Sequence, residues 1–271
     1  MKYVLWTLGA FALCAGFGYG VTLLIHRKKK MTKTGKILST VLFSILFATA
    51  MTLGYLGIYS HAEDAAKEAM KGNDTVKVTK IRGGYFFNGP SEDTALVFYP
   101  GAKVEETAYA PLLIKIAESG ADCFLAEMPF RMAIFKTDAA EDLLKDTSYE
   151  HLCIAGHSMG GMIAANYVNS HPDTFEGIIF LASYPVKEIP EAMKVVSIYG
   201  TEDHCLNRKA YEEGKAYWSG KELIIEGGNH AQFGNYGKQS GDGEALIGTD
   251  EQQSQTVSEI LSFLKSKPPV R

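Results

Sequence analysis

The chain has 271 residues, of which 46% are hydrophobic and 21% charged, and its formal net charge is −4. The apolar fraction excludes a disordered chain, and the four cysteines lack the density and spacing of a disulfide framework or a zinc site. Residues 1–60 hold seven basic and no acidic side chains, whereas the rest of the chain holds 20 basic and 31 acidic ones. A body with a net charge of −11 is repelled by phosphate backbones, so we expect no nucleic-acid partner.

Two long uncharged runs begin the chain, at residues 3–25 and 37–60. Each is long enough to cross a hydrocarbon core of about 30 Å. The loop 26–36 between them carries six Lys or Arg side chains, and a short basic loop of this kind stays on the cytoplasmic side. The sequence therefore predicts a transmembrane hairpin over residues 1–60, in a two-span cell-membrane protein whose remaining chain lies outside the cytoplasm. Gly16 and Gly20 are spaced to let the two helices pack closely, although scattered small residues are common in any such helix.

A signal peptide is the alternative interpretation of this N-terminal region, because Ser60-His61-Ala62 resembles a small-residue cleavage site. The apolar runs are longer than a typical signal sequence, which favours an uncleaved anchor. Both interpretations place the rest of the chain outside the cytoplasm. Residues 61–74, which are polar and alanine-rich at their start, are predicted to form a partly helical stalk or linker.

From residue 75 to residue 271, short apolar runs alternate with longer helical periods. The predicted strands are Val76–Ile81, Gly84–Phe87, Ala95–Tyr99, Cys123–Glu127, His151–Ala155, Gly177–Ala182, Val195–Tyr199 and Glu222–Ile225. The predicted helices are Glu106–Ser119, Ala139–Lys145, Met159–Ser170, Arg208–Trp218 and Glu251–Lys265. This alternation predicts an α/β domain, with a mostly parallel sheet covered by helices on both faces.

A Gly-x-Ser-x-Gly sequence lies at Gly156–Gly160, between a predicted strand and a predicted helix. A serine on a sharp strand-to-helix turn is exposed above the sheet, and glycines two positions away on each side relieve the crowding that the turn creates. The adjacent helix N-terminus favours developing negative charge. Ser158 is therefore the candidate nucleophile.

A serine hydroxyl needs a base to take its proton and a carboxylate to orient that base. Asp203 follows the predicted strand Val195–Tyr199, and His230 follows the predicted strand Glu222–Ile225, so both lie at the edge where parallel sheets carry their sites. Glu202 is the competing acid, but the spacing Gly-x-x-Asp favours Asp203. The histidines that we expect to play no part as the base are His151, His157, His171 and His204.

Two backbone N–H groups should stabilise the oxyanion that forms when the serine attacks. One is that of Met159, which follows the nucleophile. The other belongs to the turn Pro100–Lys103 after the strand Ala95–Tyr99, where Ala102 is the favoured donor and Lys103 the alternative.

Together these motifs resemble the α/β-hydrolase superfamily, and within it the small bacterial branch related to dienelactone hydrolases. The motifs that carry the resemblance are Pro100-Gly101-Ala102, Gly156-His157-Ser158-Met159-Gly160-Gly161, Gly200-Thr201-Glu202-Asp203, Gly227-Gly228-Asn229-His230, the stretch from Asn229 to Gly237, and Gly241-Asp242-Gly243. The resemblance covers roughly residues 75–267, and the last two stretches look like a membrane-anchored bacterial group. It implies an α/β-hydrolase fold, a Ser158–Asp203–His230 triad, and no metal or organic cofactor. Pro100 stands where many relatives have a histidine, and dienelactone hydrolases use a cysteine nucleophile, so their substrate is not carried over.

The pocket is expected to be open, because only Ser183–Met193 separates two strands where many relatives insert a cap. Phe130, Met132 and Phe135 are candidate substrate-binding residues, with packing beneath the rim as the alternative. We expect an ester hydrolase that acts on a small or lipid-like ester beside the membrane. The alternatives are an acyltransferase, thioesterase or amidase with the same triad, and a binding module without activity.

Overall fold

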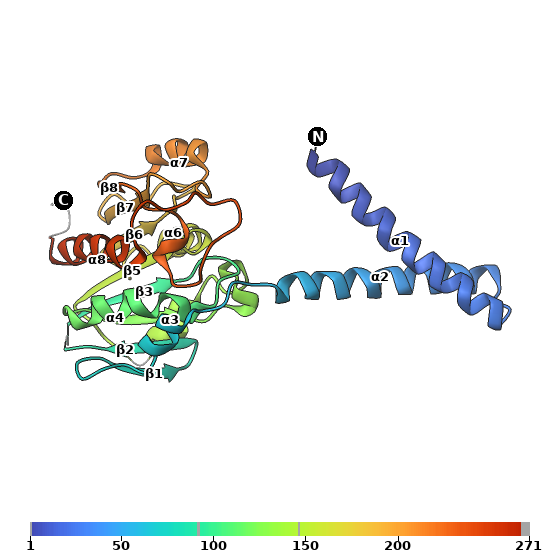
Figure 1. Cartoon of the computed structure of the whole chain (residues 1–271), viewed down its shortest axis with the longest axis horizontal. Coiled ribbons are helices and arrows are strands. Elements are labelled where there is room, and N and C mark those ends of the chain that lie inside the picture. Colours follow the sequence, from blue (N-terminus) through green and yellow to red (C-terminus); the bar gives the residue numbers. More distant parts are fainter. Residues whose placement is uncertain (1, 91–92, 146, 267–271) are drawn as a thin grey trace. The chain divides into compact units, whose positions relative to one another are not determined.

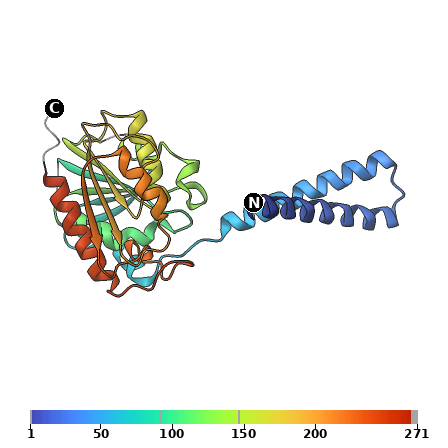
Figure 2. The same cartoon turned by 90° about the horizontal axis from the view of Figure 1, so that it is seen from above.

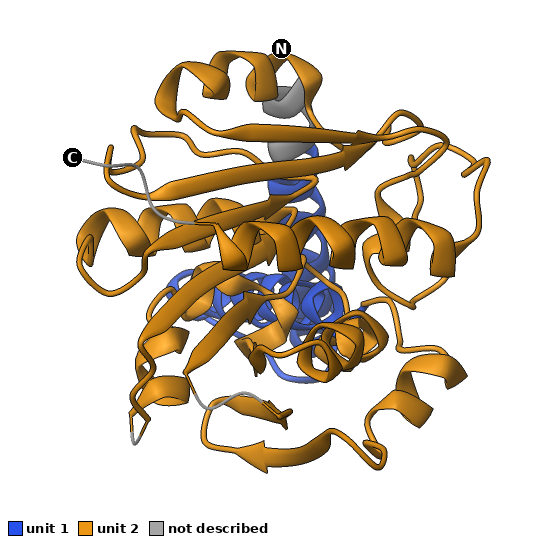
Figure 3. Cartoon of the chain, turned by 90° about the vertical axis from the view of Figure 1, so that its left-hand side faces the viewer, with its two compact units in different colours: residues 1–58 blue, residues 59–271 orange. Residues whose placement is uncertain are grey.

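The computed structural model describes residues 2–90, 93–145 and 147–266. The chain divides into two compact units, Met1–Ile58 and Tyr59–Arg271, coloured separately in Figure 3. Of the domains predicted from the sequence, residue 1 and residues 91–92, 146 and 267–271 lie outside the described residues. Each unit is described by itself below.

The first unit is a pair of helices, α1 (Lys2–Lys28) and α2 (Lys33–Gly57), shown in blue in Figure 1. Both are long and apolar enough to cross a membrane by length and composition. The side chain of Thr32 caps α2 by accepting the Gly35 N–H at 3.1 Å, which fixes where the helix begins.

Among the glycines of α1, Gly18 is the one packed closely against α2, and Gly16 and Gly20 are not. A Cβ atom on Gly18 would collide with the backbone and side chain of α2, at Thr40 and Ser44, whereas Gly16 and Gly20 face open space. Nearby, the Phe17 and Phe47 rings stack with their centroids 4.1 Å apart. Which glycine allows close helix packing therefore depends on which side of α1 faces α2, and the spacing of the glycines in the sequence did not identify it.

The second unit contains one sheet of eight strands in the order β1-β2-β4-β3-β5-β6-β7-β8. Strands β3 to β8 are parallel, and β1 and β2 pair antiparallel at one edge. The strands are β1 (Lys77–Ile81), β2 (Gly84–Asn88), β3 (Thr94–Tyr99), β4 (Asp122–Ala126), β5 (His151–His157), β6 (Gly177–Leu181), β7 (Lys194–Gly200) and β8 (Lys221–Ile225). Each matches a predicted strand to within a few residues.

Helices cover both faces of the sheet, as Figures 1 and 2 show. The helices are α3 (Asp64–Ala69), α4 (Ala110–Glu118), α5 (Ala139–Leu144), α6 (Met159–Ser170), α7 (Arg208–Gly214) and α8 (Thr249–Lys265), and single 3-10 turns lie at Glu106–Tyr109, Pro129–Arg131, Ala133–Phe135, Lys215–Tyr217 and Ala231–Phe233. Helices α3, α4 and α8 share one apolar cluster, whereas α5 and α6 share another. The fold is therefore the α/β class that the sequence predicts.

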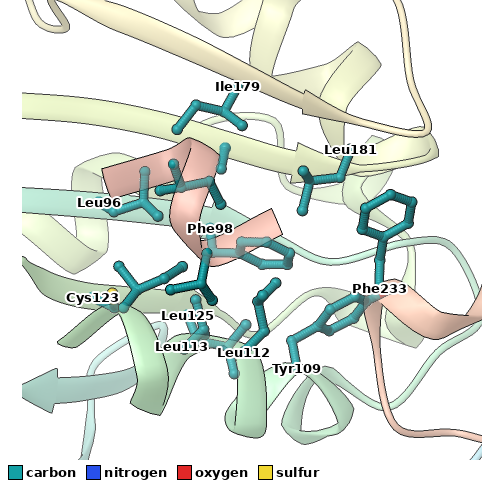
Figure 4. Close-up of a cluster of buried hydrophobic side chains, with 14 of the residues drawn as sticks. Leu96, Phe98, Tyr109, Leu112, Leu113, Cys123, Leu125, Ile179, Leu181 and Phe233 are labelled. Carbon is teal, nitrogen blue, oxygen red and sulfur yellow. The ribbon is translucent and has the colours of Figure 1, made fainter. Parts of the chain in front are cut away.

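Strand β3 shows why the sheet is buried on both sides. Leu96 and Phe98 point into the cluster with α4, drawn in Figure 4, whereas Val97 and Tyr99 point into the cluster with α6. All four side chains are fully buried. A strand buried on both faces has a continuous apolar sequence, which explains why Ala95–Tyr99 was recognisable without an alternating pattern.

The segment 61–74, expected as a partly helical stalk or linker, packs on the rest of the second unit. Ala62 and Ala66 lie in the same apolar cluster as α4 and are almost completely buried. The small alanine side chains allow α3 to lie close to α4. The segment that follows α2 is therefore part of the folded unit.

The connection between β6 and β7 is short. Residues 182–193, all of which the structure describes, contain no helix. No cap domain is inserted at this position, as the sequence predicts.

Candidate active site

Ser158 lies between the end of β5 and the start of α6, in a conformation that L-amino acids rarely adopt, with φ 52° and ψ −123°. Both flanking glycines are required by the surroundings. A Cβ atom on Gly156 would collide with the backbone of Gly160 and Gly161, and one on Gly160 would collide with the carbonyl oxygens of Tyr99 and Pro100. The Ser158 N–H donates to the Leu181 carbonyl at 2.9 Å, which ties the turn to β6.

Asp203 and His230 form a buried pair at the ends of β7 and β8. The His230 Nδ1 atom lies 2.9 and 3.1 Å from the two Asp203 carboxylate oxygens, and each residue is 2% exposed. The carboxylate also accepts the N–H groups of Cys205 at 3.0 Å and Leu206 at 2.7 Å. These bonds fix the Asp203 carboxylate, so Nδ1 of His230 carries the proton and Nε2 is left free to act as a base.

The serine turn and the loop after β8 meet at His157. The His157 ring, one residue before the nucleophile, contacts the His230 ring with 4.5 Å between centroids. The strands β5, β7 and β8 end at the same edge of the sheet, and the segments that follow them carry Ser158, Asp203 and His230.

The oxyanion turn, which we define as residues Pro100–Lys103, offers one N–H that its neighbours do not use. The Gly101 N–H donates to the Tyr109 hydroxyl at 3.1 Å, and the Lys103 N–H donates to the Arg131 carbonyl at 2.7 Å. The N–H groups of Ala102 and of Met159 have no acceptor among the described residues. This pattern favours Ala102 over Lys103 as the second donor, beside Met159 at the N-terminus of α6.

His157 and Tyr109 form a buried contact that sequence reasoning missed. The Tyr109 hydroxyl accepts the Gly101 N–H and lies 2.8 Å from His157 Nδ1. The tyrosine therefore gives its own proton to Nδ1, so the His157 proton is on Nε2, an atom that has no partner in the described part of the chain. Burial, reinforced by the neighbouring His230, lowers the pKa of His157 well below its usual value and keeps the ring neutral.

A second missed residue, Asp242, connects the acid and base loops. One of its oxygens accepts the Ala231 N–H at 2.9 Å, and the other accepts the His204 N–H at 3.2 Å. Ala231 follows the candidate base, and His204 follows the candidate acid. The Gly241-Asp242-Gly243 sequence carried the family resemblance, but nothing in its spacing indicated this role.

The candidate substrate-binding residues lie on the loop after β4. Phe130 and Phe135 are 47% and 53% exposed, and their rings meet edge to face with centroids 5.7 Å apart. Met132 is half-buried. Phe130 has φ 53°, so a strained backbone presents this ring at the surface, and the loop is bonded to the oxyanion turn through Arg131.

No cluster of three or more histidine, cysteine or acidic side chains suited to a metal ion occurs within residues 2–90, 93–145 and 147–266.

Comparisons with known proteins place this geometry in a family. No curated protein matches the chain. The solved structures of similar fold include MGS-M1, an α/β hydrolase from a Medee basin deep-sea metagenome library, which is 16% identical with a TM-score of 0.52 over 72% of this chain and 100% of that one. Est1E from Butyrivibrio proteoclasticus, with ferulic acid bound, is 14% identical with a TM-score of 0.51 over 71% of this chain and 98% of that one. A CIB-like hydrolase from Thermoplasma acidophilum is 17% identical with a TM-score of 0.50 over 69% of this chain and 98% of that one.

The sequence itself matches the profile described as the Alpha/beta hydrolase family over residues 95–254, more than half of the chain. The matched region contains the serine turn, the acid–base pair and the oxyanion turn. The protein therefore belongs to the α/β-hydrolase family.

Proposed function

We propose that this protein is a membrane-anchored serine hydrolase that cleaves carboxylic esters through an acyl-enzyme. The observation that carries the proposal is the buried Asp203–His230 pair, whose histidine ring contacts His157, the residue before a serine held at φ 52°. A buried carboxylate that fixes the histidine tautomer, next to a strained serine on a strand-to-helix turn, is the arrangement that activates a hydroxyl for attack.

In the acylation step, His230 Nε2 takes the proton of the Ser158 hydroxyl as Oγ bonds to the ester carbonyl carbon. The carbonyl oxygen becomes an oxyanion, stabilised by the N–H groups of Met159 and Ala102. The tetrahedral intermediate then collapses, the bond to the alcohol oxygen breaks, and His230 gives the proton to the departing alcohol. Asp203 remains ionised and stabilises the imidazolium.

In the second step, His230 takes a proton from water as the water oxygen attacks the acyl carbon. Collapse of the second intermediate returns the proton to Ser158 and releases the carboxylic acid. Transfer of the acyl group to an alcohol or amine would use the same acyl-enzyme with a different second nucleophile.

The anchoring part of the proposal rests on α1 and α2, which are long and apolar enough to span a bilayer. The basic loop between them supports a cytoplasmic position for residues 26–36 and a catalytic unit on the other side. Exposed Phe130 and Phe135 near the oxyanion turn support an ester with an apolar acyl group.

The full chain in detergent, assayed with p-nitrophenyl esters of increasing acyl length, tests this function. We expect turnover that Ser158→Ala reduces by a factor on the order of 10⁵ or more. Cleavage of amides or thioesters with no cleavage of any ester would contradict the substrate class, and equal activity of Ser158→Ala would contradict the mechanism.

A further inference from the structure

The segment Tyr59–Glu63, which we call the exit segment because it follows α2, is bonded directly to the last residue of the oxyanion turn and to the chain just after it. The Ser60 N–H donates to the Lys103 carbonyl at 2.8 Å, and the Ser60 carbonyl accepts the Glu105 N–H at 2.8 Å. These two bonds make a parallel bridge between Ser60 and Val104. The chain leaving α2 thus adds a short strand beside the active site.

Lys103 is the residue most dependent on this bridge. It has φ 58°, a left-handed conformation that is unfavourable for a lysine. Its N–H is held by the Arg131 carbonyl at 2.7 Å, and its carbonyl is held by the Ser60 N–H. Strained backbone persists only where the surroundings over-determine it, and the Ser60 bond is among the interactions that keep the end of the oxyanion turn in place.

A side-chain bond reinforces the bridge one residue further along. The Ala62 N–H donates to a Glu105 carboxylate oxygen at 3.0 Å. Partial burial acts to raise the pKa of Glu105, but the hydrogen bonds from Ala62, Thr107 and His61 together lower it, so the carboxylate is charged when it accepts the Ala62 N–H. Charge-assisted bonds of this kind are stronger than neutral ones.

The exit segment also reaches the loop that carries the base. The Glu63 N–H donates to the Asn235 carbonyl at 2.8 Å, and the Asn235 N–H donates to the Ala108 carbonyl at 2.8 Å. Asn235 follows His230 by five residues. One short segment is therefore bonded to the chain after the oxyanion turn at one end and to the chain after the catalytic histidine at the other.

We propose that the exit segment is a positioning part of the active site, in which the Ser60 N–H holds the oxyanion turn in its catalytic conformation. This inference rests on the proposed function. Without the bond, Lys103 relaxes toward negative φ and the Ala102 N–H moves away from the oxyanion. The chain that follows α2 is then a working part of the enzyme, and proteolytic cleavage after Ala62 would separate Ser60 from the oxyanion turn.

Ser60→Pro in the full chain, in detergent micelles, tests the inference because proline has no N–H to donate. We expect a loss of kcat of roughly tenfold to a hundredfold with KM within about twofold, because an oxyanion donor acts in the transition state. The inhibition constant of a trifluoromethyl ketone, whose adduct with serine mimics the tetrahedral oxyanion, should rise in parallel. Ser60→Ala keeps the N–H and should keep the wild-type inhibition constant.

A second experiment relieves the backbone strain at Lys103. Glycine adopts positive φ without cost, so Ser60→Pro combined with Lys103→Gly should recover part of the kcat that Ser60→Pro loses. A merely structural role of Ser60 predicts no such recovery. If Ser60→Pro fails to fold, Glu105→Ala and Glu105→Gln replace it, because only glutamine keeps an acceptor for the Ala62 N–H. Glutamine should then restore the kcat that alanine loses.

The inference is overturned if folded Ser60→Pro has the wild-type kcat and inhibition constant, if Lys103→Gly recovers nothing, or if the two Glu105 variants have equal kcat. Activity that survives Ser158→Ala would instead contradict the proposed function. The two failures are therefore distinguished by which variant keeps its activity.

Discussion

The Asp203 carboxylate makes four close contacts with three donors, which are two backbone N–H groups and one histidine nitrogen that lies near both carboxylate oxygens. Replacing it by asparagine preserves its shape but presents an amide that no longer fixes the His230 tautomer. We expect Asp203→Asn to lower kcat by a factor on the order of 10⁴ with the fold retained. Steady-state kinetics and circular dichroism check both parts.

The neighbouring Glu202 is the matched control for Asp203, since it was the competing acid. Its side chain accepts the Thr201 hydroxyl at 3.1 Å and makes no contact with His230. Glu202→Gln should therefore keep kcat within about twofold of the wild type. A large loss in this variant with little loss in Asp203→Asn would reverse the assignment of the acid.

The lowered pKa of buried His157 makes the free energy of unfolding depend on pH. Its pKa in the folded state is well below 6.5, so below about pH 6.5 the unfolded chain binds a proton that the folded state does not. The stabilisation is complete above pH 6.5 and is lost as the pH falls, by up to about 1.4 kcal/mol per pH unit for one group. We expect the thermal midpoint of the full chain in detergent to fall between about pH 7 and pH 5.

In His157→Phe, which keeps an aromatic ring and removes the titrating group, the fall in thermal midpoint with pH should be shallower. Identical slopes in the two proteins would show that His157 does not titrate on unfolding. The pH dependence of the thermal midpoint that remains in the variant comes from the carboxylates and the other histidines.

The positions of Ser158, Asp203 and His230 after strands β5, β7 and β8 were predictable because each follows a recognisable strand and lies near a glycine. His157 and Tyr109 were not, because they are separated by 48 residues and meet only when the turn after β3 packs against the end of β5. Proximity created by packing leaves no periodic signal in the sequence. The same holds for Asp242, whose two acceptor roles depend on loops after different strands.

At the scale of elements, the loop with Phe130 and Phe135 is the feature whose role is most open to a direct test. Each ring is about half exposed, beside the oxyanion turn. We expect Phe130→Ser and Phe135→Ser to raise the KM of a long-chain ester by roughly tenfold, the loss of about 1.4 kcal/mol of apolar contact, with little effect on an acetate ester.

Ile224 provides a control for general surface effects. It is 47% exposed, and it lies on the edge strand β8, which is separated from β4 by four strands in the sheet. Ile224→Ser should leave the KM of both esters unchanged. Equal effects of all three variants, or equal effects on long and short esters, would argue that the loop does not contact the acyl group.

The central strands β3 to β7 were predicted well because most of their residues are buried, and their sequences are therefore short apolar runs separated by turns. Residues 61–74 were misassigned for a physical reason. Ala62 and Ala66 are small, and α3 lies between charged residues, so the segment lacked the apolar stripe of a core helix although two of its alanines are buried. The bridge at Ser60 uses backbone groups only, which no side-chain pattern reveals.

At the scale of the whole molecule, the net charge of −4 combines a basic N-terminal region with an acidic catalytic unit. The basic loop 26–36 predicts which side of the membrane the unit occupies. We expect protease added outside intact cells to digest the catalytic unit, detected with an antibody against a C-terminal tag. Full protection in intact cells, with digestion after lysis, would place the unit in the cytoplasm.

The central claim is that Ser158 is a nucleophile activated by His230. A fluorophosphonate probe, which bonds covalently to an activated serine, measures this most directly in the full chain. The account predicts one modified peptide, identified by mass spectrometry at Ser158, no labelling of Ser158→Ala, and much slower labelling of His230→Ala. Absence of labelling in the wild type, or labelling of Ser158→Ala at the wild-type rate, would contradict it.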